Sequence, residues 1–150
     1  MKIIILAGGY SPEREVSLSS GSLIANALME QGHEVFFLDP WPGIRAGEEV
    51  RYRTREEGYH FSSEIGMEAP DLEKLRAGHG MKKTLIGPGV LKACREADMV
   101  FIALHGGAGE DGRFRRFWRH TEFHIREAAG RAACWRWIRI FPRFLCGRPE

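Results

Sequence analysis

The sequence predicts an α/β fold built around a parallel β-sheet. Two observations support this prediction: short apolar runs each end in a glycine-bearing loop, and a helix-like segment separates the first two runs. The chain has 150 residues, of which 43% are hydrophobic and 28% are charged, as expected for a soluble globular protein. No stretch approaches the roughly 18 apolar residues that a membrane span needs, so we expect no membrane partner.

The first expected unit is a strand, a helix and a second strand. The continuous apolar run over residues 2–7 is typical of a strand buried on both faces, and turn residues follow it at 8–12. Apolar residues recur at helical spacing over 14–31, and Gly32 marks the end of this helix. The apolar run at 35–38 is a second strand. This strand–helix–strand unit predicts two parallel strands joined by a right-handed crossover.

The rest of the predicted domain is less regular. Within residues 41–87, partial alternation over 51–61 favours an edge strand or hairpin, and 70–76 favours a short helix. A compact helix is expected at 89–97 and a third buried strand at 99–104. The prediction is therefore a Rossmann-like domain with at least three parallel strands and an irregular surface excursion.

Ionisable side chains gather in the loops that follow the first and third strands. The first loop carries Glu13 and Glu15, and the second carries His105, Glu110 and Asp111. Ligands of parallel sheets bind beyond the carboxyl ends of the strands, so both loops should face one crevice. Glycines let the backbone approach a ligand closely, and helix N-termini offer free N–H groups to an anion.

Simpler interpretations of these loops stay open from the residues alone. Gly8-Gly9 also fits a plain tight turn, and Glu13 and Glu15 fit first-turn acids that complement a helix dipole. The dinucleotide-binding pattern G-x-G-x-x-G is absent after the first strand. It does occur at 107–112, which leaves a non-catalytic nucleotide-binding module as an alternative function.

Two segments carry a resemblance to a known enzyme family. Residues 8–21, GGYSPEREVSLSSG, resemble the first signature of D-alanine–D-alanine ligases, and residues 105–112, HGGAGEDG, resemble the second. The resemblance covers 1–114 and implies the N-terminal domain of an ATP-grasp ligase. It also implies a cytoplasmic, homodimeric enzyme of peptidoglycan biosynthesis, on which the cell wall and cell shape depend. That enzyme joins two D-alanines through an acyl phosphate, using ATP and Mg²⁺.

The resemblance assigns roles to particular residues. Glu13 would hold the ammonium group of the first D-alanine, Val16 would line that subsite, and His105 would approach the same D-alanine. Ser17 would support the first loop, and Glu110 would join a hydrogen-bond network that anchors a mobile loop from elsewhere. The supporting glycines are Gly8, Gly9, Gly106 and Gly109.

The family's ATP and Mg²⁺ sites lie in later domains, which cannot be matched in this chain. We therefore expect a truncated ligase that is inactive alone, with no complete catalytic set and no metal site. Three scattered cysteines, Cys94, Cys134 and Cys146, are too few for a disulfide framework or a zinc site. They fit a reducing cytoplasm.

Residues 115–150 differ in composition from the rest. They contain nine Arg, three Glu, three of the four Trp, and no Lys or Asp. Codons can be chosen that encode residues 114–143, and the same bases can then be translated from one position earlier. The resulting peptide resembles the family's next segment, through its Met-Asp-Lys motif. We therefore interpret 115–150 as an out-of-frame tail with no recognised domain. The alternative is a basic arm, since Arg interleaved with Trp suits single-stranded nucleic acid.

Overall fold

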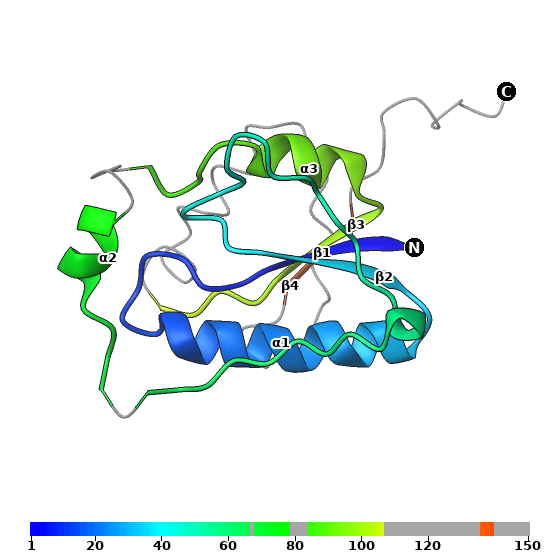
Figure 1. Ribbon diagram of the computed structural model, residues 1–150, viewed down its shortest axis with the longest axis horizontal. Coiled ribbons are helices and arrows are strands. Elements are labelled where there is room, and N and C mark those ends of the chain that lie inside the picture. The colour runs from blue at the N-terminus through cyan, green and yellow to red at the C-terminus, as the bar shows by residue number, and fades with distance from the viewer. Residues whose placement is uncertain (67, 79–83, 107–135, 140–150) are drawn as a thin grey trace, which may run out of the picture.

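The computed structural model describes residues 1–66, 68–78, 84–106 and 136–139 of the chain. A mixed sheet of strand order β2-β1-β3-β4 separates two helical layers, with α1 on one face and α3 on the other (Figure 1). The strands β1 (Lys2–Leu6), β2 (Glu34–Leu38) and β3 (Met99–Ile102) are parallel. The predicted α/β class and its three parallel strands are therefore confirmed.

The central strand β1 explains why its sequence is apolar without interruption. Ile3 to Leu6 are each at most 1% exposed, because β2 and β3 flank the strand and helices cover both faces. Ile4 and Leu6 belong to the core on the α3 side, and Ile3 and Ile5 to the core on the α1 side. Because successive side chains of a strand point to opposite faces of the sheet, this one segment contributes to both cores.

The helix α1 (Arg14–Glu30) follows the expected span, but it packs through small residues. Its buried residues are Ser17, Gly21, Ser22, Ala25 and Met29, whereas Leu23, which fits the apolar helical spacing, is 70% exposed. A Cβ at Gly21 would lie 2.6 Å from the Cβ of Ala7. The absence of a side chain there lets the helix lie close against the sheet.

The opposite face is covered by one short helix and by irregular segments. The helix α3 (Val90–Glu96) buries Val90, Ala93 and Cys94 against the sheet, close to its expected span. The short helix α2 (Leu72–Gly78) and the 3₁₀ helix η1 (Arg55–Glu57) are the helical elements described within 41–87. The expected edge strand or hairpin over 51–61 is reduced there to a single antiparallel bridge between Arg53 and Val35.

The strand β4 (Arg136–Arg139) pairs antiparallel with β3. These four residues lie within 115–150, and they extend the sheet at its β3 edge. An open strand edge offers unpaired N–H and C=O groups, so any extended segment that reaches it can pair with it. In the described part of the chain, no helix has the length and apolar character that crossing a membrane requires.

Candidate functional site

The loops that follow β1 and β3 meet beyond the carboxyl ends of these strands. A Cβ at Gly106 would lie 2.8 Å from Ser11 Oγ and 3.1 Å from the carboxyl carbon of Glu13. Gly106 also has a positive φ of 65°, which a side chain would disfavour. The backbone of the second loop at Gly106 therefore lies directly against Glu13 of the first loop.

Ser17 ties the first loop to the end of β3. Its hydroxyl accepts a hydrogen bond from the Gly8 N–H at 2.8 Å and donates one to the Ala103 carbonyl at 2.6 Å. The residue is fully buried in the first turn of α1. Because one hydroxyl serves both strand ends, Ser17 fixes the position of the first loop relative to the second.

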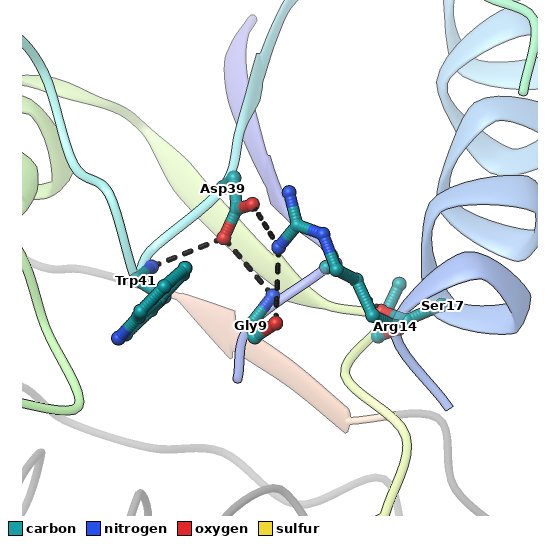
Figure 2. Close-up of polar contacts among 7 residues, drawn as sticks. Gly9, Arg14, Ser17, Asp39 and Trp41 are labelled. Atoms are coloured by element: carbon teal, nitrogen blue, oxygen red, sulfur yellow. Dashed lines mark hydrogen bonds and ion pairs between the residues drawn. The ribbon is translucent and has the colours of Figure 1, made fainter. Parts of the chain in front are cut away.

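Asp39 is a second anchor of the first loop (Figure 2). Its Oδ1 accepts hydrogen bonds from the Gly9 N–H at 2.9 Å and the Trp41 N–H at 3.1 Å. Its Oδ2 forms an ion pair with the guanidinium group of Arg14, which also donates to the Gly9 carbonyl at 3.0 Å. Both the N–H and the carbonyl of Gly9 are thus held by this ion pair.

This anchor was missed in the sequence. Asp39 precedes a proline at the end of β2, where an aspartate is ordinary turn chemistry. Arg14 lies inside the first signature segment, so an acidic partner for it was a signal that could have been sought. Nothing in the spacing of the two residues, 25 positions apart, indicates that they meet.

The residues predicted to touch the ligand lie around the contact between Glu13 and Gly106, which we call the junction. Glu13 is exposed immediately before α1, and its backbone N–H donates to Ser11 Oγ at 3.1 Å. Val16 is 40% exposed in the first turn of α1. His105 is half-buried and directly precedes Gly106. The predicted residues Gly109 and Glu110 lie outside the described residues.

The electrostatic character of the junction is set by Glu13. The ion pairs found among the described residues do not include Glu13; they join Arg14 to Asp39, Arg53 to Glu57 and Lys74 to Asp71. Residues 1–66, 68–78, 84–106 and 136–139 contain no group of three or more His, Cys, Asp or Glu side chains arranged to hold a metal ion. Among the described residues, the Glu13 carboxylate therefore forms no ion pair.

Comparisons with known proteins agree with the two signature segments. A family model described as "D-ala D-ala ligase N-terminus" matches residues 2–124. The chain is 39% identical over 121 residues to the D-alanine–D-alanine ligase of Lacticaseibacillus casei, covering 75% of this chain and 32% of that protein. It is 40% identical over 119 residues to the ligase of Pediococcus pentosaceus, covering 75% and 33%. The chain therefore spans about a third of the length of these relatives.

Proposed function

This chain belongs to the D-alanine–D-alanine ligase family, as its N-terminal domain, and on that premise we propose that it supplies the binding site for the first D-alanine. The observation that carries the proposal is the contact between the two loops, which sets the Glu13 carboxylate against Gly106. A carboxylate without a cationic partner in the described part of the chain suits the ammonium group of an amino acid.

The surrounding residues support this role in different ways. Val16 lies on the exposed first turn of α1, where it can contact the methyl group of the ligand. His105 precedes Gly106 at the same junction and would approach the ligand from the second loop. Ser17 and the glycines Gly8, Gly9 and Gly106 shape the loops. By the family resemblance, Gly109 would be a further supporting residue, and Glu110 would join a hydrogen-bond network that anchors a mobile loop from elsewhere.

The activity of the whole protein is proposed from the family. The complete enzyme would activate one D-alanine as an acyl phosphate and join it to a second, for peptidoglycan biosynthesis in the cytoplasm. This chemistry needs ATP and Mg²⁺, and the family resemblance places their sites in later domains. We propose no residue of this chain for the ATP site, the Mg²⁺ site or the homodimer interface of the family.

A titration of the 150-residue chain tests the binding proposal. We expect D-alanine to shift the backbone amide resonances of Gly106 and Val16 with a dissociation constant on the order of 1 mM, since one charge-assisted contact dominates. D-lactate, which replaces the ammonium with a hydroxyl group, should give no comparable shift, and Glu13→Gln should abolish the response. Equal responses to D-alanine in the wild type and Glu13→Gln would contradict the proposal.

The same chain should lack the complete reaction. We expect no release of phosphate from ATP that depends on D-alanine, because the chain spans only a third of the length of its relatives. A full-length relative assayed in parallel is the positive control. D-alanine-dependent phosphate release by purified 1–150 would overturn this expectation.

We also propose that residues 115–150 arise from a one-base shift of the reading frame near Phe114. The family match ends at residue 124, so residues 125–150 lie outside it. Resequencing the gene from the codon of Gly112 past that of Glu150 tests this. An extra base, or an open shifted frame of ligase sequence downstream, is the expected result. A confirmed stop with no ligase sequence in any frame would favour a genuine basic arm, whose nucleic-acid binding would weaken steeply with salt.

A further inference from the structure

Two neighbouring residues of the first loop carry opposite charges and do not pair with each other. Glu13 and Arg14 are adjacent in sequence, yet the guanidinium group of Arg14 lies on Asp39 and on the Gly9 carbonyl (Figure 2). Among the described ion pairs, none joins Arg14 to Glu13. The only cation next to Glu13 in the sequence is therefore held elsewhere.

Burial explains why Arg14 pairs with Asp39. The side chains of Arg14 and Asp39 are 17% and 14% exposed, whereas Glu13 is exposed to solvent. Charges in a partly buried site attract more strongly than charges in water. Asp39 is also fixed in place by the N–H groups of Gly9 and Trp41, so little side-chain freedom is lost when Arg14 binds it.

The same contacts position two aromatic residues beside the loop, Tyr10 and Trp41. Tyr10 follows Gly9, and its ring lies 5.0 Å from that of Trp41, centroid to centroid. Trp41 is 4% exposed. Asp39 therefore lies between two backbone segments that it holds together, the loop after β1 and the loop after β2.

We infer that Asp39 is a positioning residue that holds Arg14 away from Glu13, so that the loop presents an uncompensated carboxylate to the ammonium group of a ligand. This inference rests on the proposed function, because it assumes that Glu13 binds that ammonium. Loss of the charge at position 39 releases Arg14, which then competes with the ligand for Glu13.

A measurement without ligand tests where Arg14 lies. The guanidinium N–H signals of Arg14 should exchange slowly with water in NMR spectra of the wild-type chain, because they are held by Asp39 and the Gly9 carbonyl. This protection should survive Glu13→Gln and be lost in Asp39→Asn. Protection that is lost in Glu13→Gln, or kept in Asp39→Asn, would overturn the inference whether or not the chain binds D-alanine.

A titration with D-alanine tests the consequence for binding. Asp39→Asn keeps an oxygen that can accept from Gly9 and Trp41, but it should weaken D-alanine affinity about fivefold, the range expected when an exposed ion pair competes. The double variant Arg14→Gln/Asp39→Asn removes the released cation and should return the affinity to within about twofold of wild type. A merely structural role predicts that the double variant binds no better than the single one.

Controls separate this inference from the proposed function. Glu57→Gln removes the carboxylate of the exposed Arg53–Glu57 pair and should change neither measurement. If wild type and Glu13→Gln both fail to bind D-alanine, the proposed function fails, and the exchange measurement alone decides the position of Arg14. If Asp39→Asn does not fold, the double variant must still bind like wild type; weaker binding by more than about fivefold would overturn the inference.

Discussion

The two faces of the sheet are covered in different ways, although both bury residues of the same strand. One helix of 17 residues, α1, covers the face that contains Ile5. The face that contains Ile4 is covered by the 7-residue helix α3 and by irregular segments that include Ile44, Val50 and Ile86. A long helix moves as a unit, whereas irregular segments can shift separately. Equal burial on the two faces therefore does not imply equal rigidity.

The largest expected effect comes from truncating the neighbouring residues Ile4 and Ile5, which are both 0% exposed. Ile5→Ala should lower the free energy of unfolding by about 4 kcal/mol, and Ile4→Ala by about 3 kcal/mol. The difference reflects how well each cavity can collapse, since α1 lies close against the sheet at Gly21. Urea unfolding of both variants measures it. A larger loss for Ile4→Ala would show that the irregular cover is the more rigid one.

A smaller effect is expected where an irregular segment crosses the α1 face. The side-chain amide of Asn26 donates to the Phe61 carbonyl at 2.8 Å and accepts from the Phe61 N–H at 2.9 Å. The Phe61 ring stacks on Phe37 at 5.4 Å between centroids. Asn26→Ala should cost about 1–2 kcal/mol of stability, because two part-buried backbone groups lose their partner.

Limited proteolysis and urea unfolding check the Asn26 prediction. Cleavage between residues 59 and 66 should become faster in Asn26→Ala while the strands stay resistant. Glu30→Ala, at an exposed position of the same helix, serves as the matched control and should change stability by less than about 0.5 kcal/mol. Unchanged cleavage in Asn26→Ala would mean that ring packing alone holds this segment.

The smallest effect at neutral pH is expected on the α3 face, at Tyr52. Burial raises the pKa of Tyr52 to about 12, and the Cys94 thiolate and the Asp98 carboxylate act in the same direction. Its hydroxyl is buried and forms no hydrogen bond with any of the described residues. The pKa in the unfolded chain is near 10, so this group favours folding below pH 10 and its contribution is lost as the pH rises towards 12.

Tyr52→Phe should therefore change stability by less than about 1 kcal/mol at pH 7, because no hydrogen bond is broken. Between pH 10 and 12 it should lose stability less steeply than wild type. Burial also raises the pKa of Cys94 to about 12, so part of the alkaline loss remains in the variant. Thermal unfolding across this pH range provides the measurement. Identical pH profiles for wild type and Tyr52→Phe would place the hydroxyl in contact with water.

The elements β1 and α1 were predictable because each has a local signature. The uninterrupted apolar run of β1 indicated a strand buried on both faces, and the spacing before Gly32 indicated α1 to within a residue of its observed end. The buried side of α1 was harder to predict, since its close contact at Gly21 and Ala25 depends on small residues. Side-chain size mattered more there than hydrophobicity, and Leu23 remained exposed.

For the candidate site, the amino-acid sequence was enough to predict which two loops come together, because parallel strands bring their carboxyl ends to one edge of the sheet. The family signatures that contain Glu13, Ser17 and His105 could also be read from it. How the loops are held became visible only in the folded chain. The hydroxyl of Ser17 reaches β3 86 residues away, and Arg14 pairs with Asp39 at the end of another strand. These pairings depend on which residues the fold brings together and buries, and no local sequence pattern encodes them.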